Sequence, residues 1–171
     1  MPERRASGGE PVASRPSMPG YGILPANAGG GLLPWDWAVE RLQRAHNYWV
    51  ATTRPDGSPH LAAVWGVWFD GAVCFSTGGR SRKARNLAAE PRCAVTPEGA
   101  GESVVLEGTA ERITGPGRIA RLTAAYLDKN GSGFPDPDEN PLFAVNPRVV
   151  IGLVELDPGL GASATRWTFA S

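Results

Sequence analysis

The stretch "YWVATTRPDGSPHLAAVWGVWFDGAVCFSTG", residues 48–78, decides the fold because apolar and polar residues alternate through much of it. Such a period of two is typical of β-strands, whose successive side chains point to opposite faces of a sheet. Two turn signals, Pro55-Asp56-Gly57 and Asp70-Gly71, divide the stretch into three runs. Asp-Gly between apolar runs favours a hairpin because glycine takes positive φ without steric cost. The stretch therefore predicts an antiparallel meander.

Further strands are expected downstream. "RCAVTPE" (92–98) and "ESVVLEGTAERI" (102–113) predict two strands, and "RVVIGLVEL" (148–156) and "ATRWTF" (164–169) predict two more. A loop with little regular structure is expected before residue 148, because it contains four prolines: Pro135, Pro137, Pro141 and Pro147. About six to seven antiparallel strands with short helices predict a mainly β (α+β) domain, a small closed or split β-barrel.

Three segments return to helical spacing, namely residues 34–47, 80–89 and 117–130. Proline suits the start of the first of these, and Gly131 ends the last one. Residues 1–17 are rich in Pro, Gly, Ser and Arg and predict a disordered tail. Residues 18–33 predict an extended arm, and residues 34–171 the barrel domain.

Composition excludes several classes of function. The 17 basic and 17 acidic residues cancel, so the bulk charge gives no reason to expect a nucleic-acid partner. Cys74 and Cys93 form no C-x-x-C pair and predict buried, reduced thiols; with only His46 and His60 in addition, no metal site is expected. No apolar run approaches the roughly 18 residues of a membrane span. The basic N-terminal residues are not followed by the apolar segment that a signal peptide has. A cytoplasmic protein is therefore expected.

A second stretch carries the chemistry: "FSTGGRSRKARNL", residues 75–87, places four cations directly after an apolar strand and two glycines. A helix that starts there presents unpaired N–H groups and a partial positive charge, which suits a phosphate or carboxylate. The spacing is not that of a Walker A loop. From the residues alone, an anion site and a solvated basic helix face both remain open.

The segment from Trp49 to Ile113 resembles the split β-barrel flavoproteins of the pyridoxamine 5'-phosphate oxidase superfamily. The resemblance covers about 65 residues and rests on the ordered pieces "ATTRPDGSPHLAAVWGVWFDG", "CFSTGGRSRKARNLAAEPR" and "VVLEGTAERI". In the oxidase a similar F-x-T-x-x-x-S-R-K-A segment holds the phosphate of FMN. Carried onto this chain, those roles fall on Ser76, Thr77, Arg82 and Lys83.

The variant "RSRKARNLAAEPR", together with "RPDGSPH" and "ATRWTF", looks more like the deazaflavin (F420)-dependent reductases of the superfamily, specifically their B group. The resemblance implies that the cofactor ring lies against the strand before the phosphate turn, contacted mainly by backbone groups. The cofactor-binding residues expected on this basis are Ala62, Ala63, Val64, Trp65, Val67, Ser76, Thr77, Gly78, Arg80, Ser81, Arg82, Lys83 and Asn86. Arg80 and Arg85 suit the longer anionic tail of F420.

One departure bears on the activity. The oxidase has an arginine where this chain has Ala62, and its substrate-binding residues near the C-terminus have no clear match in "SATRWTFAS". Oxidation of pyridoxamine phosphate is therefore not expected, whereas the cofactor site is retained.

The resemblance implies an F420-dependent oxidoreductase that transfers a hydride to or from a small conjugated substrate. It also implies a homodimer, because the cofactor crevice of this superfamily lies between subunits. The candidate proton donors are His60, Arg166 and water, and the candidate pocket residues are Trp68 and Trp167. Three alternatives stay open: an FMN-dependent oxidoreductase, a non-catalytic protein that binds flavin, F420 or a tetrapyrrole, and a purely structural barrel.

Overall fold

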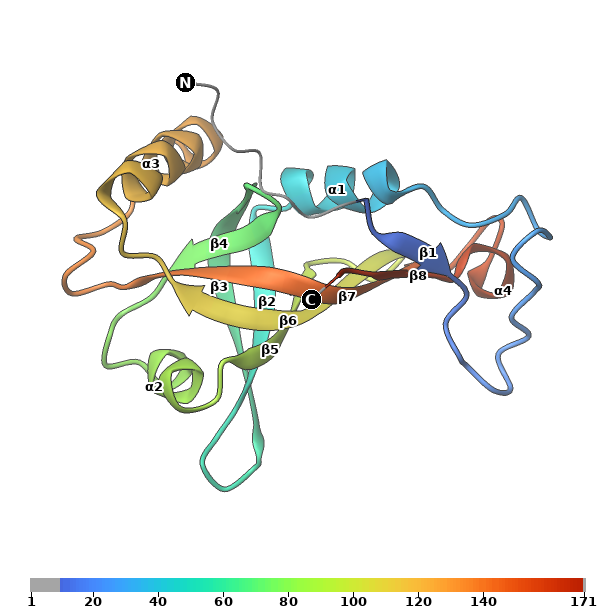
Figure 1. The fold of residues 1–171 in the computed structure, drawn as a ribbon, viewed down its shortest axis with the longest axis horizontal. Coiled ribbons are helices and arrows are strands. Elements are labelled where there is room, and N and C mark those ends of the chain that lie inside the picture. Colours follow the sequence, from blue (N-terminus) through green and yellow to red (C-terminus); the bar gives the residue numbers. More distant parts are fainter. Residues whose placement is uncertain (1–9, 171) are drawn as a thin grey trace.

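The computed structural model describes residues 10–170, and within them the chain forms strands and short helices (Figure 1). In chain order the elements are β1 Val12–Ser14, α1 Trp35–Arg44, β2 Asn47–Thr53, β3 Pro59–Phe69, β4 Ala72–Ser76, α2 Arg82–Ala89, β5 Arg92–Pro97, β6 Glu102–Arg112, α3 Pro116–Asn130, β7 Leu142–Val154, α4 Leu160–Ser163 and β8 Thr165–Thr168.

Six of the strands close into a barrel. The hydrogen-bonded order is β7-β4-β3-β2-β5-β6, and β6 pairs again with β7 to close the ring. Every pairing is antiparallel. The first half of β7 pairs with β4, whereas its second half pairs with β8, so the sheet divides along this strand. The predicted split β-barrel is confirmed.

Strand β7 starts earlier than the sequence indicated. It begins at Leu142, so the expectation of irregular structure up to residue 147 is wrong for its last six residues. Pro147 fits into this central strand because the register shifts beside it: Gly108 lies opposite Pro147, Glu107 lies opposite Val149, and Arg148 is the extra residue. A bulge tolerates proline, which has no N–H to donate to the ladder.

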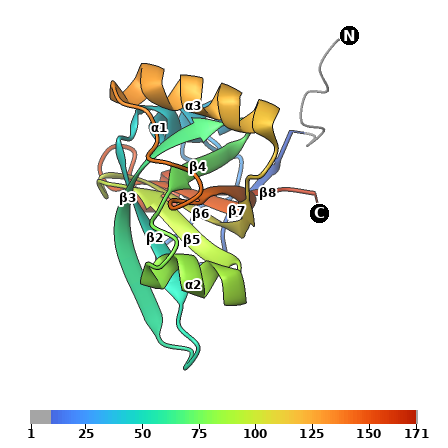
Figure 2. The same cartoon turned by 90° about the vertical axis from the view of Figure 1, so that its left-hand side faces the viewer.

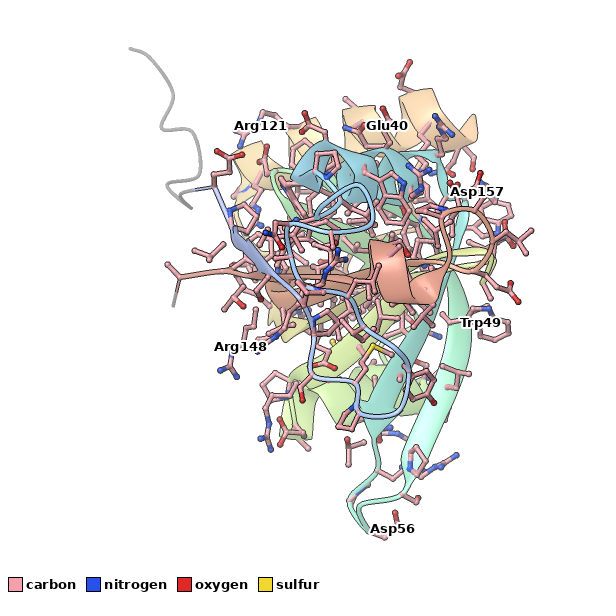
Figure 3. All side chains as sticks on the ribbon, turned by 90° about the vertical axis from the view of Figure 1, so that its right-hand side faces the viewer. Glu40, Trp49, Asp56, Arg121, Arg148 and Asp157 are labelled. Atoms are coloured by element: carbon pink, nitrogen blue, oxygen red, sulfur yellow. The ribbon has the colours of Figure 1, made fainter. Side chains whose placement is uncertain are left out.

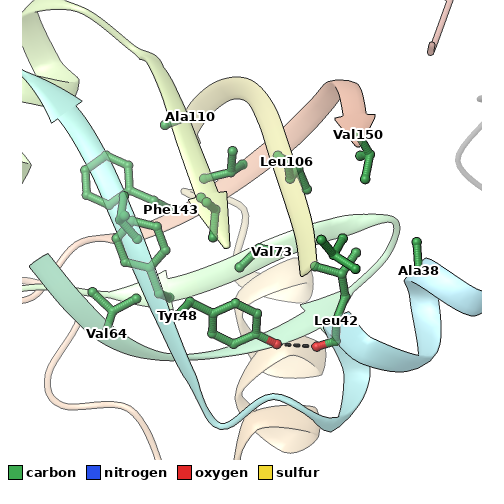
Figure 4. Close-up of a cluster of buried hydrophobic side chains, with 14 of the residues drawn as sticks. Ala38, Leu42, Tyr48, Val64, Val73, Leu106, Ala110, Phe143 and Val150 are labelled. Atoms are coloured by element: carbon green, nitrogen blue, oxygen red, sulfur yellow. Dashed lines mark hydrogen bonds between the residues drawn. The ribbon is translucent and has the colours of Figure 1, made fainter. Parts of the chain in front are cut away.

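The alternation of the strands builds the core inside the barrel. Tyr48 and Val50 of β2 point inward and are fully buried with Leu106 and Val150 (Figure 4). The hydroxyl of Tyr48 donates to the carbonyl of Leu42, which ties β2 to α1. A smaller apolar cluster lies between the outer side of β3 and β4 and helix α3, which covers that side of the barrel in Figure 2.

The helix ends follow from their residues. Helix α3 ends before Gly131, which takes the left-handed conformation at φ 71° that glycine adopts at low cost. Helix α1 stops at Arg44, three residues before the predicted end, because Asn47 already pairs with Trp65 as the first residue of β2.

The N-terminal prediction needs a correction. Residues 1–9 lie outside the described residues, but Val12–Ser14 are not disordered: they form an edge strand that pairs with β8. Arg15 then donates to the carbonyls of Ala164, Ala28 and Gly31, at 2.8, 3.1 and 3.2 Å. The predicted arm, residues 18–33, contains neither helix nor strand and is fastened to α4 and β8 of its own domain.

Candidate functional site

The cationic stretch forms a tight turn between β4 and α2. Ser81 is the N-cap of α2, and its hydroxyl accepts a hydrogen bond from the N–H of Ala84 at 3.2 Å. The N–H groups of Arg82 and Lys83 lie in the first turn of the helix. They have no carbonyl partner within the helix, because the carbonyls four residues earlier lie outside it. The turn therefore presents backbone donors and the positive end of the helix dipole to the same side.

The hydroxyls that were expected to hold a phosphate take part in the turn itself. Thr77 is buried, and its hydroxyl lies 3.1 Å from that of Ser81. The hydroxyl of Ser76 donates to the carbonyl of Asn140 at 3.4 Å. These three side chains shape the turn, which leaves the backbone donors and the long cationic side chains as the groups most available to an anion.

Residues 139–141 support the two glycines of the turn. The sequence did not connect this segment with the site. The N–H of Gly79 donates to the carbonyl of Glu139 at 2.9 Å, and the N–H of Thr77 donates to that of Pro141 at 3.3 Å. At Gly78, by contrast, an added Cβ would have no neighbour nearer than 3.8 Å. One side of the turn is therefore held by residues 139–141, whereas at Gly78 an added Cβ would make only an ordinary contact, with Oδ1 of Asn140.

The cations around this turn are free of carboxylate partners in the described part of the chain. Within residues 10–170 no ion pair involves Arg80, Arg82, Lys83 or Arg85. The three arginines are exposed, whereas Lys83 is partly buried, and burial lowers the pKa of its ammonium group. A cation whose charged form is disfavoured by burial gains from a nearby anion.

The strand expected to face the cofactor ring has a free edge. Residues 59–65 of β3 pair with β2, but β4 pairs only with residues 66–69, so the opposite edge before Gly66 has no strand partner in the described chain. Val64 points into the core, and Ala63 and Trp65 point outward. The backbone of Ala62–Trp65 is therefore available for hydrogen bonds to a flat ring, beside the point where the chain turns toward α2.

A polar network joins the same strand to α2. Asn86 is buried, and its amide Nδ2 donates to the hydroxyl of Thr52 at 3.0 Å. That hydroxyl lies 3.4 Å from Nδ1 of His60. Thr52 was missed from the sequence, although a polar residue at an inward position of an otherwise apolar strand was a usable signal. The pKa of His60 is lowered, first by burial and then by the positive charges of Arg54, Lys83 and Arg82.

Four of the expected residues lie away from this turn. Val67 is buried under α3 and its backbone pairs with Cys74. Trp68 lies against Trp35 at the far end of β4, beside a cavity of about 330 Å³. Trp167, expected at a substrate pocket, is 1% exposed and packs in the core. Arg166 lies on β8, at the opposite side of the molecule from α2 (Figure 1).

The residues that surround the turn fit the phosphate end of a flavin-type cofactor. The set consists of two helix N–H groups, an ammonium group and several guanidinium groups, all of them donors, and the backbone at Gly78 is not closely packed by neighbouring atoms. Such a set binds a phosphate through charge-assisted hydrogen bonds. Arg82 and Lys83 would hold the phosphate, and the free edge of β3 would contact the ring.

Other features of the described chain bear on function. Neither cysteine forms a disulfide, and burial raises the pKa of each thiol to about 12. Among residues 10–170, no group of three or more His, Cys, Asp or Glu side chains is placed to hold a metal ion. None of the helices in that range has the length and apolar character needed to cross a bilayer.

Solved structures with the same fold come from several bacteria. A conserved hypothetical protein of Mycobacterium tuberculosis is 23% identical with a TM-score of 0.61, over 69% of this chain and 82% of its own. A heme binding protein of Mycobacterium smegmatis is 22% identical with a TM-score of 0.63, over 81% of this chain and 59% of its own. A protein described as an F420 reductase is 24% identical with a TM-score of 0.53, over 65% of this chain and 93% of its own. At these identities the similarity shows a shared fold.

The sequence itself gives the family. No curated protein matches the chain significantly. The family profile described as pyridoxamine 5'-phosphate oxidase matches residues 35–151, which span the barrel from α1 into β7 and include the cationic turn and the free edge of β3. With its six-stranded split barrel, the chain belongs to the pyridoxamine 5'-phosphate oxidase family.

Proposed function

We propose that the protein is an F420-dependent oxidoreductase of the B-group type, which transfers a hydride between reduced F420 and a small conjugated organic molecule. The observation that carries this proposal is the set of four cations around the glycine turn, at the start of α2, which form no ion pair with a carboxylate of residues 10–170. F420 carries a phosphodiester that continues into further anionic groups. More cations than a single phosphate needs therefore favour F420 over FMN.

The cofactor and the residues around it have different roles in the proposed reaction. When bound, the deazaflavin supplies the hydride chemistry of its ring, as redox cofactors do in general. Arg82 and Lys83 bind the phosphate, and Arg80 and Arg85 lie next to them for the rest of the anionic tail. The backbone of Ala62–Trp65 orients the ring, and the outer side of β2 and β3 offers it an apolar surface.

The proposal extends to the oligomeric state. Three large apolar side chains on the outer side of β2 and β3 are exposed: Trp49 by 44%, Leu61 by 60% and Trp65 by 52%. Trp49 stands out from the body of the domain in Figure 3. Exposed apolar surface of this kind marks an interface, and we propose that a second copy of the chain covers it as a homodimer. Sedimentation analysis should give a dimer for the wild type and a monomer for Trp49→Glu.

The cofactor test is a pair of fluorescence titrations, with F420 and with FMN, on the same preparation. Tight binding of F420, and its oxidation from the reduced form in the presence of enones or quinones, would support the proposal. Tight binding of FMN with no response to F420 would replace it by an FMN-dependent oxidoreductase. Binding without turnover would favour a carrier, a role that the heme binding neighbour makes worth testing with heme. If the protein binds none of F420, FMN and heme, the remaining alternative is a purely structural barrel.

The remaining sequence-based assignments belong to the same proposal. Small-molecule substrates, the absence of a nucleic-acid partner and a cytoplasmic location stay predictions from the sequence. His60 is retained as the candidate for hydrogen bonding at the site, because it lies within the influence of Arg82 and Lys83.

A further inference from the structure

We propose that Thr52 and Asn86 are positioning residues that hold the ring of His60 with its proton on Nε2, so that His60 donates a hydrogen bond to an anionic oxygen of the group bound at α2. This inference rests on the proposed function, because it names a further contact of the same site. It adds a neutral donor from β3 to the cationic donors of α2.

The direction of the hydrogen bonds follows from what each group is able to donate. Asn86 is 1% exposed and Thr52 is 3% exposed, so water does not satisfy them readily. Because the amide Nδ2 of Asn86 donates to the hydroxyl of Thr52 at 3.0 Å, that hydroxyl acts there as an acceptor and keeps its own proton to donate. Two groups of His60 lie within reach of that proton: the carbonyl at 3.5 Å, and Nδ1 at 3.4 Å, where the direction of the hydrogen bond depends on the tautomer. The proposal assigns the proton of Thr52 to Nδ1, the nearer of the two.

A donor at Nδ1 fixes the tautomer of the ring. A neutral imidazole carries one proton, and a nitrogen that accepts a hydrogen bond has none. With Nδ1 as the acceptor, the proton lies on Nε2 and is directed away from Thr52. His60 is only partly buried, so part of the residue remains accessible to a ligand.

The surrounding charges keep the ring neutral and favour an anion next to it. Arg54 from the hairpin and Lys83 and Arg82 from α2 all oppose a positive charge on His60, and burial opposes it more. The carboxylate on this hairpin, Asp56, is engaged by the N–H and hydroxyl of Ser58, at 2.9 and 2.7 Å. A neutral N–H on which three cations act electrostatically matches an acceptor oxygen that carries negative charge, such as that of a phosphate.

Histidine NMR tests the tautomer directly. The chain has only two histidines, so in His46→Gln every histidine signal comes from His60. We expect ¹⁵N spectra of the protein labelled at histidine to show Nδ1 without a proton and Nε2 with one near pH 7. Thr52→Ser should keep this pattern, because serine retains the hydroxyl. Thr52→Val should give a mixture of tautomers. A wild-type ring with its proton on Nδ1, or the same spectrum for Thr52→Val as for wild type, would overturn the inference.

Inorganic phosphate then tests the contact itself. Saturating phosphate should shift the Nε2 signal of His60 and raise its pKa, because the anion offsets the positive charges around the ring. It should leave His46 of the wild type unchanged. Thr52→Val should weaken phosphate binding about 3- to 10-fold, the range of one neutral hydrogen bond, and Thr52→Ser should not. A phosphate that binds without shifting His60 would contradict the inference.

The two proposals fail in different experiments. If neither F420 nor FMN binds to the wild type, the proposed function fails, and the tautomer and phosphate results still decide the role of His60. If F420 binds with unchanged affinity to folded Thr52→Val and the His60 signals do not move, the positioning role fails while the proposed function stands.

Discussion

Gly108 of β6 lies directly opposite Pro147 of β7 at the bulge in the longest strand pair of the barrel. The backbone of Asn146 approaches Gly108 so closely that a Cβ at this position would overlap the carbonyl oxygen of Asn146. The absence of a side chain at Gly108 and the absence of an N–H at Pro147 therefore serve the same local geometry. Together they allow β7 to pass from its pairing with β4 to its pairing with β8.

Gly108→Ala should destabilise the fold. The contact involves backbone on both strands, so relief requires the pair to separate, and overpacking of this kind typically costs about 1–3 kcal/mol. Urea denaturation should show the lower free energy of unfolding. Gly101→Ala is the matched control, because a Cβ there meets nothing within 4 Å. Equal stability of the two variants would show that the close approach at the bulge is not a constraint.

Arg15 should hold the arm rather than the barrel. Its guanidinium group donates to carbonyls of residues 28 and 31 of the arm and of Ala164 beside α4. Arg15→Ala should therefore speed cleavage by chymotrypsin at Tyr21, which is 62% exposed, with little change in the thermal midpoint of the barrel. Arg44→Ala, which removes an exposed cation of α1, serves as the control. If Arg15→Ala is cleaved at the same rate as wild type, contacts other than those of Arg15 hold the arm in place.

Lys129 should make stability depend on pH in a defined window. Its ammonium group donates to the carbonyl of Ala45 and lies 3.2 Å from the hydroxyl of Tyr48, and burial lowers its pKa to about 8, from the ordinary 10.5. Below pH 8 both the folded and the unfolded chain hold this proton. Between about pH 8 and 10.5 the unfolded chain holds more of it, so the contribution of Lys129 to the free energy of unfolding rises with pH.

The comparison that isolates this effect is wild type against Lys129→Met. The thiols of Cys74 and Cys93 act in the opposite direction, since their raised pKa values remove stability as the pH rises from about 9 toward 12, but they do so equally in both proteins. We expect the difference in the free energy of unfolding, wild type minus variant, to increase from pH 7 to pH 10 in chemical denaturation. A flat difference would show that the ammonium group is not desolvated as the structure indicates.

The meander was predictable from the sequence because its signals are local. Asp70 and Gly71 take φ values of 48° and 77°, the pair of positive angles that an Asp-Gly hairpin turn requires. Strands β2, β3 and β4, which the two turns of the meander connect, follow from the alternation of apolar and polar residues. Closure of the barrel was expected only in outline, since pairing of β6 with β7 joins residues about 40 positions apart.

The elements that were missed depend on distant partners. Strand β1 has three residues and no pattern of its own, and it exists because β8 offers an edge. Trp167 was assigned to a pocket because its residue type does not show which face it occupies. An added Cβ at Gly152 would lie 2.7 Å from the ring of Trp167, so this glycine provides the space that turns the ring into the core.

The candidate site divides in the same way. The cationic turn was predicted correctly as a helix start after a strand and two glycines, all within one short stretch. The buried link from Asn86 to Thr52 was not, since it requires α2 to pack on β2. The support of Gly79 by Glu139 was also missed, because 60 residues separate the two positions.

The most direct test of the account is a titration of F420 into wild type and Lys83→Met, followed by cofactor fluorescence. A charge-assisted hydrogen bond contributes about 1.5–3 kcal/mol, so we expect the dissociation constant of Lys83→Met to rise about 10- to 100-fold. Arg44→Met, which removes a cation from the surface of α1, should bind as tightly as wild type. Equal affinity of a folded Lys83→Met for F420 would contradict the assignment of the α2 turn as the site that binds the phosphate.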